Sequence, residues 1–136
     1  MRSVFADAGY WIALLNRQDQ LHEKAKAVSA TLGPVRIVTS EMILTEVLNG
    51  LAHLGSSVRE AAAQLVDSLR KDPNVTIHPQ TSKLFQRAHR RYAERLDKEW
   101  GLVDCATLLL MEDEGVTEIL AHDHHFEQAG CTALLR

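Results

Sequence analysis

The sequence alternates short apolar runs with longer stretches whose apolar residues recur every three or four positions. The short runs have the length of strands, and the longer stretches have the period of helices. Such alternation is typical of βαβ units, in which parallel strands lie side by side and helices cover the sheet. We therefore predict an α/β fold, a three-layer sandwich with a mainly parallel sheet of four or five strands and helices on both faces.

The same pattern gives the approximate bounds of each element. The expected strands are 4–6, 35–38, 75–77 and 118–121, with 132–135 as a fifth. The expected helices are 9–16, 20–32, 41–54, 58–71, 82–96 and 103–114. Residues 106–111 are apolar nearly all round the last of these helices, which predicts that it is central and buried.

Length, charge and cysteine content bound the class of protein. The 136 residues fit one domain, 1–136, and the formal net charge of −3 argues against a protein held to nucleic acid by bulk positive charge. Cys105 and Cys131 are far apart and form no disulfide framework, which favours a reducing compartment. No apolar run approaches the roughly 20 residues of a membrane span, and no secretion signal is recognised. We expect a cytoplasmic protein without a membrane segment.

Four acidic residues fall where a parallel sheet gathers its functional groups. Asp7 closes the first strand, and Asp123 closely follows the fourth. Glu46 lies in the helix after the second strand, and Asp104 lies in the first turn of the buried helix. Because sites in such sheets form outside the carboxyl ends of the strands, this fold can bring the four side chains to one edge.

Clustered carboxylates need a cation. Without one, they repel one another and raise one another's pKa. Mg²⁺ and Mn²⁺ prefer oxygen ligands and combine a few carboxylates with waters and a substrate phosphate. Such an ion can activate a water and stabilise the charge of a phosphodiester during transfer. The cluster therefore indicates a divalent cation and a nucleic-acid backbone as substrate.

Each acid also has a purely structural interpretation. Asp7 and Asp123 can cap the helices that follow them, and Asp104 can stabilise the start of its helix through the helix dipole. Glu46 can be a solvated helix residue. The spacing alone leaves these interpretations open beside a shared metal site.

Four segments resemble, in order, the four motifs of the PIN-domain ribonucleases of the VapC toxin type. They read VFADAGYWIALLN at 4–16, VTSEMILTEV at 38–47, WGLVDCA at 100–106 and AHDHHF at 121–126. His22 also matches a frequent family histidine in the second helix. The resemblance covers nearly the whole chain, and the acids of the family's motifs fall on Asp7, Glu46, Asp104 and Asp123.

The resemblance implies a PIN-like sandwich and an endoribonuclease that depends on Mg²⁺ or Mn²⁺. The four acids would be both the catalytic and the metal-binding residues. A metal-bound water would attack the phosphorus in line, with Glu46 as the residue that orients this water or accepts its proton. Many small members are toxins of type II toxin–antitoxin pairs, so the implied partners are RNA, a cognate antitoxin and a second copy of the chain.

The third motif departs from the family pattern. The family usually carries Ser and Thr at the positions of Gly101 and Val103, and a hydroxyl residue at Ala8. Losses of supporting hydrogen bonds around a metal typically cost about 10–100-fold in affinity or activity. Two alternatives therefore stand beside the toxin: a weakened PIN-fold module that binds RNA or protein, and a PIN nuclease of RNA maturation without an antitoxin.

Two further groups of residues invite a function. His122, His124 and His125 suggest zinc, but a closed structural site needs four nitrogen or sulfur ligands, and no partners stand at finger-like spacing. We expect these histidines to flank the carboxylate edge. A basic stretch is interpreted as a solvated face, with a phosphate-binding strip that includes a stacking Tyr92 as the alternative. It comprises Arg87, Arg90, Arg91, Arg95 and Lys98. Tyr10, Trp11 and Trp100 are expected in the core or in a dimer contact.

Overall fold

A computed structural model describes all 136 residues and contains one sheet of five parallel strands. The order across the sheet is β3-β2-β1-β4-β5, so the first strand is central. The α/β prediction is therefore confirmed. The strands are β1 (Arg2–Ala6), β2 (Val35–Ser40), β3 (Val75–His78), β4 (Glu118–Leu120) and β5 (Thr132–Ala133).

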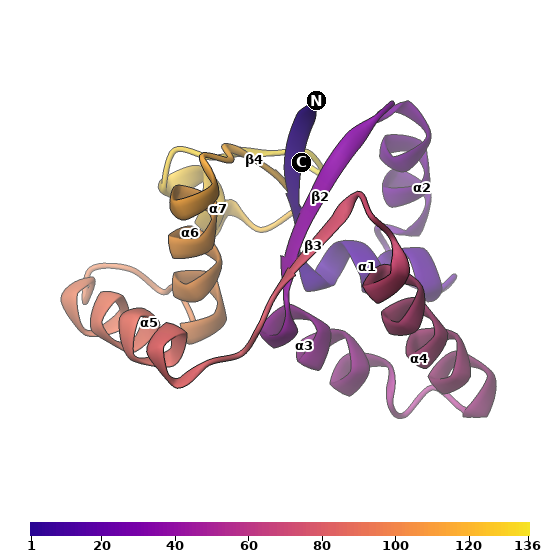
Figure 1. The fold of residues 1–136 in the computed structure, drawn as a ribbon. Coiled ribbons are helices and arrows are strands. Elements are labelled where there is room, and N and C mark those ends of the chain that lie inside the picture. Colours follow the sequence, from indigo (N-terminus) through magenta and orange to yellow (C-terminus); the bar gives the residue numbers. More distant parts are fainter.

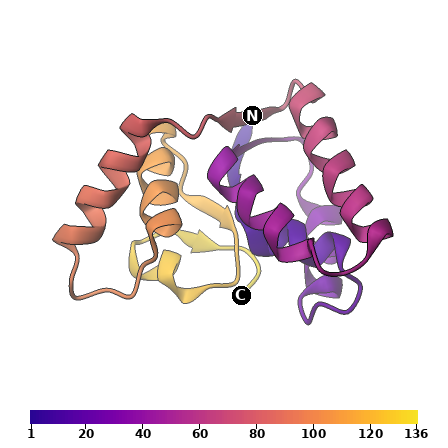
Figure 2. The same cartoon turned by 90° about the horizontal axis from the view of Figure 1, so that it is seen from below.

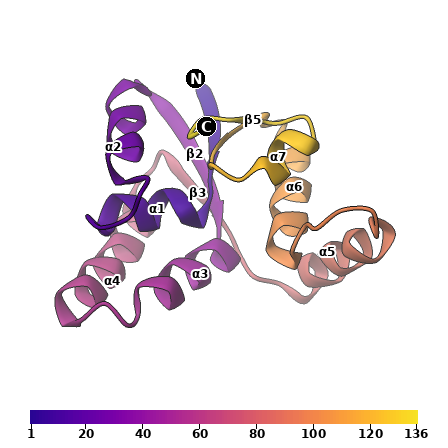
Figure 3. The same cartoon turned by 180° about the vertical axis from the view of Figure 1, so that it is seen from behind.

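Helices cover both faces of this sheet. The helices form two groups on opposite sides of the sheet (Figure 1), and the views from below and behind show the same division (Figures 2 and 3). The first group is α1 (Ala8–Leu15), α2 (His22–Thr31), α3 (Glu41–Leu51) and α4 (Ser56–Lys71). The second group is α5 (Ser82–Glu94), α6 (Leu102–Glu114) and α7 (His124–Gln128). None of these helices is both long and apolar enough to cross a membrane.

The strand order reverses direction next to β1. The chain first builds outward from β1 through β2 to β3, and then returns to place β4 on the other side of β1. The β1–β4 pair is in register at Phe5 with Ile119, and the Asp7 N–H donates to the Leu120 carbonyl oxygen at 3.2 Å. Such a reversal leaves a crevice at the carboxyl ends of the two strands, where ligands of open α/β sheets bind.

The central strand and α6 form the middle of the core. Val4, Phe5 and Ala6 are fully buried, and every residue of α6 from Cys105 to Met111 is at most 9% exposed. Tyr10, Trp11 and Trp100 are also buried within this chain, so no dimer contact is needed to cover them. The prediction of a central, buried sixth helix is confirmed.

The main differences from the expected elements lie around the α3–α4 turn. The third helix ends at Leu51 rather than near residue 54, and Leu48 and Leu54, which continue its apolar period, are exposed. The fourth helix begins at Ser56 rather than at residue 58 and has Gly55 at its N-cap. Gly55 adopts φ = 97°, a conformation that glycine tolerates and that turns the chain sharply between the two helices.

Candidate metal centre

The structure places all four predicted acids at the carboxyl edge of the sheet. Asp7 directly follows β1, and Asp123 follows β4 at the start of α7. Glu46 lies in the second turn of α3, and Asp104 lies in the first turn of α6. Their mutual influence shows that they are near one another, because the charges of Asp104, Glu46 and Asp123 each raise the pKa of Asp7.

Asp7 is the most perturbed of the four. Burial raises the pKa of its carboxyl to about 7, and the three neighbouring acids push it in the same direction. The backbone N–H of Ala8 opposes this rise but does not cancel it. Asp7 occupies the N-cap position of α1, yet its side chain makes no capping hydrogen bond. Capping therefore does not account for a carboxyl at this position.

Glu46 lies at the rim of the cluster. Its side chain is exposed to solvent, as the structural interpretation expected. Partial burial of the carboxyl nevertheless raises its pKa, and the charge of Asp104 raises it further. Glu46 is thus both reachable from solvent and electrostatically coupled to the cluster.

Asp104 is held by its own helix end. The Gly101 N–H donates to Asp104 Oδ2 at 3.0 Å, and His125 Nδ1 lies 3.1 Å from the same oxygen. The dipole of α6 also favours a carboxylate in the first turn. These contacts fix Oδ2 and leave Asp104 Oδ1 without a hydrogen-bond partner in the protein. The predicted helix-start role is present, and it leaves one oxygen available for another ligand.

Asp123 caps the short helix α7, as one of its interpretations predicted. Its Oδ1 accepts the His125 N–H at 3.0 Å. The same oxygen lies 3.3 Å from His125 Nδ1 and 3.5 Å from His124 Nδ1. All of these contacts involve Oδ1, so the second carboxylate oxygen has no hydrogen-bond partner in the protein.

An open hollow of about 540 Å³ gives access to this edge. Arg136 reaches it from the C-terminus and pairs with Glu127 at 3.2 Å, while His122 Nδ1 lies 3.0 Å from the Leu135 carbonyl oxygen. The histidines flank the carboxylate edge as expected. The lining residues are Asp7, Gly9, Leu21, His122, Asp123, His124, His125 and Arg136.

The donor set fits a hard divalent cation. The cluster offers carboxylate oxygens from four separate elements, and no Lys or Arg forms an ion pair with any of them. The only cationic candidates in contact are His124 and His125, which carry charge only when protonated. Mg²⁺ and Mn²⁺ take such oxygen ligands, and a dication would offset both the burial and the repulsion that raise the pKa of Asp7.

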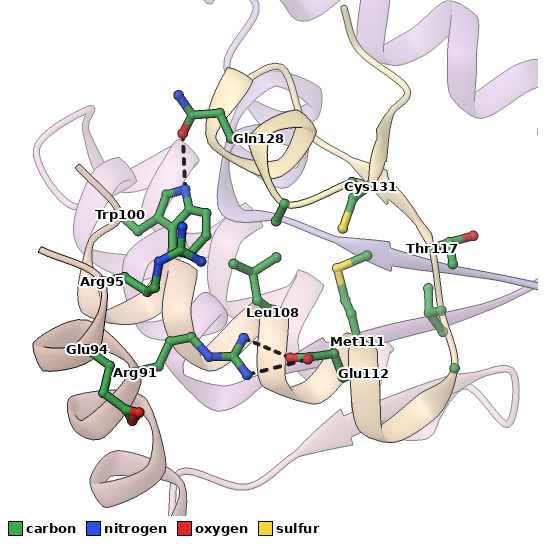
Figure 4. Close-up of a pocket in the computed structure, with 14 residues that line it drawn as sticks. Arg91, Glu94, Arg95, Trp100, Leu108, Met111, Glu112, Thr117, Gln128 and Cys131 are labelled. Atoms are coloured by element: carbon green, nitrogen blue, oxygen red, sulfur yellow. Dashed lines mark hydrogen bonds and ion pairs between the residues drawn. The ribbon is translucent and has the colours of Figure 1, made fainter. Parts of the chain in front are cut away.

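A larger cavity lies elsewhere in the chain. It has a volume of about 700 Å³, lies beside α6 and α7, and includes none of the four acids in its lining (Figure 4). Its two arginines already have partners: Arg91 pairs with Glu112 at 2.8 Å, and the Arg95 guanidinium lies 4.9 Å from the Trp100 ring centroid. Size alone would therefore direct attention away from the carboxylates.

The basic stretch is largely neutralised by its own neighbours. Arg87 pairs with Asp113 at 2.8 Å, and Arg95 pairs with Asp97 at 3.0 Å. Together with the Arg91 pair, these contacts favour the interpretation as a solvated face over a phosphate-binding strip. Tyr92 is half exposed on this surface.

Two features of the site were missed at the level of sequence. Arg136 at the hollow carried no motif that could have revealed it. The Gly101 N–H contact to Asp104 had a signal, since an acid three residues after a helix N-cap is half of a capping box. The position of Gly101 was interpreted only as a missing hydroxyl.

Comparison with known proteins identifies the family and supports the fold. The family model described as PIN domain matches residues 4–130. The 23S rRNA-specific endonuclease VapC20 of Mycobacterium tuberculosis is 29% identical over 128 residues, which cover 93% of this chain and 94% of the relative. The crystal structure of that VapC20, described as a sarcin-ricin loop cleaving toxin, superposes with a TM-score of 0.83 at 28% identity over 95% of this chain and 96% of its own. The FitAcB structure from Neisseria gonorrhoeae has a TM-score of 0.65 at 18% identity, covers 96% of this chain and 94% of its own, and supports the fold alone.

Proposed function

Because the chain belongs to the PIN-domain family, we propose that it is a metal-dependent endoribonuclease and the toxin of a type II toxin–antitoxin pair. The observation that carries the proposal is the group of four acids without a Lys or Arg partner, in which the pKa of Asp7 rises to about 7. The similarity to a relative named as an rRNA endonuclease supports RNA as the substrate. The match to a chain described as a toxin supports the biological role.

Asp7, Glu46, Asp104 and Asp123 would hold Mg²⁺ or Mn²⁺. When bound, the ion would polarise a water and stabilise the charge that develops on the phosphodiester. Within the protein, the Gly101 N–H holds Asp104 Oδ2, and Oδ1, which has no hydrogen-bond partner, would be the oxygen available to the ion. Asp7 would be ionised by the bound dication, because an opposite charge at contact distance outweighs burial.

Glu46 is the acid best placed to handle the proton of the attacking water. Its exposure lets it reach a water at the rim, and its raised pKa moves it toward the range useful for a general base near neutral pH. The leaving oxygen would take its proton from solvent through the open hollow beside Asp123. RNA, a cognate antitoxin and a second copy of the chain are the proposed partners, and the cytoplasm is the proposed location.

The function is tested by cleavage of RNA in the presence of Mn²⁺, Mg²⁺ or EDTA. Large-subunit rRNA and its isolated hairpin loops are the first substrates, chosen from the relative's description. Wild type should cleave only with metal, and Asp104→Asn should lose about 100-fold or more of the rate, since metal-linked stabilisation amounts to several kcal/mol. Asp113→Asn, an acid of the same helix that pairs with Arg87, is the matched control and should cleave like wild type.

One observation favours a second candidate, the weakened PIN-fold binding module. Gly101 and Val103 offer no hydroxyl beside Asp104. Such a module would bind RNA or its partner equally well with and without Mn²⁺, and its melting temperature would not rise on metal addition. Folded protein that shows neither cleavage nor a metal-linked rise would favour this candidate over the nuclease.

A further inference from the structure

Three consecutive residues at the start of α7 gather nitrogen and oxygen donors, two histidines beside one acid of the carboxylate cluster. Asp123, His124 and His125 each direct one ligand atom into a space where all three atoms lie within 4.8 Å of one another. Asp123 Oδ1 is 3.5 Å from His124 Nδ1 and 3.3 Å from His125 Nδ1. The two imidazole rings are tilted by 57° with their centroids 4.8 Å apart, so they do not stack. His125 Nδ1 also lies 3.1 Å from Asp104 Oδ2, a contact that an ion bound at this nitrogen would replace.

These separations match the coordination of a small tetrahedral ion. Two ligands bound to zinc at about 2.0–2.1 Å in tetrahedral geometry are roughly 3.3–3.4 Å apart. The two distances at Asp123 Oδ1 bracket this value. Two imidazoles and one carboxylate form a donor set that suits Zn²⁺ and its transition-metal neighbours, whereas Mg²⁺ takes oxygen ligands.

The local fold holds the three donors in place. The Asp123 side chain folds back over the first turn because Oδ1 accepts the His125 N–H at 3.0 Å. Phe126, the next residue, is fully buried and anchors the turn to the core. The His125 side chain is only 18% exposed, whereas that of His124 is 59% exposed beside the open hollow. His125 is therefore held in place, His124 is free to adjust, and an ion can reach both from solvent through the hollow.

We propose that Asp123, His124 and His125 form a binding site for a transition-metal dication of the Zn²⁺ type, with the fourth position open to water. This open, three-ligand site differs from the closed structural zinc site that the sequence excluded. It shares Asp123 with the carboxylate centre but takes its selectivity from the two histidines. Binding does not require RNA cleavage, so the inference stands or falls separately from the proposed function.

The test is calorimetric titration of the untagged protein with ZnCl₂ and, separately, MgCl₂. Wild type should bind zinc, and His124→Gln should weaken zinc binding by about tenfold or more because one ligand of three is lost. His124 is the cleanest variant because its exposed side chain supports no core contact. His53→Gln, an exposed histidine at the end of α3, is the control and should bind zinc like wild type.

Magnesium separates the two sets of ligands. Mg²⁺ affinity should be the same in wild type and His124→Gln, because Mg²⁺ does not use the imidazole. Zinc affinity that is equal in wild type and His124→Gln, or an absence of zinc binding to folded wild type, would overturn the proposal. A loss in His53→Gln as large as that in His124→Gln would also overturn it, since the binding would then be nonspecific.

Discussion

The two ends of α6 carry acids in opposite surroundings. At the C-terminal end, Glu112 pairs with Arg91 and Asp113 pairs with Arg87, both at 2.8 Å, and Glu114 pairs with Arg36. At the N-terminal end, Asp104 joins a cluster of acids that no Lys or Arg neutralises. One helix thus contains both arrangements, and the chain supplies the positive charge at only one of them.

The pKa values follow this difference. The Arg87 hydrogen bond lowers the pKa of Asp113, and the Arg36 hydrogen bond lowers that of Glu114. Around the other end of the helix, burial raises the pKa of Asp7 and of Glu46. Acids at the C-terminal end are stabilised by arginines of the protein itself, whereas the acids near Asp104 have no Lys or Arg partner, which is the basis for the cation site proposed above.

The largest stability effect is expected for Asp7→Asn in metal-free protein. A carboxyl whose folded pKa is about 7 keeps a proton that the unfolded chain loses near pH 4, so stability falls as the pH rises from about 4 to 7. Asn removes this dependence. Denaturant unfolding in EDTA should show Asp7→Asn more stable than wild type by about 2–4 kcal/mol at pH 8, since one pKa unit corresponds to about 1.4 kcal/mol, and equal to it near pH 4.

Asp113→Asn, at the C-terminal end of α6, should change stability in the opposite direction. The lowered pKa of Asp113 means that its contribution is present above about pH 4 and is lost as the pH falls. The amide should therefore slightly destabilise the protein at pH 8, the opposite sign to Asp7→Asn. If both variants shift stability in the same direction at pH 8, the contrast between the two ends of α6 is wrong.

A smaller loss of stability is expected when an arginine that pairs with the C-terminal end of α6 is removed. Arg36 contacts Glu114 and also donates to Thr76 Oγ1 at 3.0 Å, so it links two strands to α6. Arg36→Met should cost about 2 kcal/mol in urea unfolding at pH 7, because it leaves a partly buried carboxylate without its charged hydrogen bond. Arg87→Met, which breaks an exposed pair, should cost at most about 1 kcal/mol. Equal losses of stability in the two variants would contradict the claim that the Arg36–Glu114 pair contributes more than the exposed Arg87–Asp113 pair.

The smallest effect is expected on Mn²⁺ affinity, when a hydroxyl is introduced beside Asp104 at the N-terminal end of α6. A Cβ at Gly101 would lie 3.9 Å from Asp104 Oδ2, and the backbone of Gly101 is extended, so serine fits without strain. Gly101→Ser should raise Mn²⁺ affinity by up to about tenfold by orienting Asp104 or a water near it. Gly101→Ala supplies the Cβ without the hydroxyl and should leave the affinity unchanged, as measured by Mn²⁺ titration.

Much of the fold could be predicted because local patterns and the final packing agree. The apolar run before Asp7 became the buried central strand, and the apolar stretch 106–111 became the buried middle of α6. The prediction was wrong at the end of α3, where Leu48 and Leu54 continue the helical period but are exposed. Periodicity cannot show where the neighbouring helix stops covering a face, and a glycine turn at Gly55 decides that locally.

The candidate site was only partly predictable. Strand ends and helix starts indicated which acids meet, because parallel strands share one carboxyl edge. The convergence of His124 and His125 on Asp123 Oδ1 could not be read from their adjacency, since it depends on side-chain directions in the first turn of α7. The pairing of Arg87 and Arg91 with acids of α6 likewise depends on how α5 and α6 pack.

The most direct test of the account is calorimetric titration of the protein with Mn²⁺ at pH 8, in parallel for wild type, Asp104→Asn and Asp113→Asn. We predict that wild type and Asp113→Asn bind Mn²⁺ with the same affinity, and that the affinity of Asp104→Asn is lower by about tenfold or more. Equal affinities for wild type and Asp104→Asn, or folded wild type that binds no Mn²⁺, would contradict the claim that the unpaired acids form a cation site.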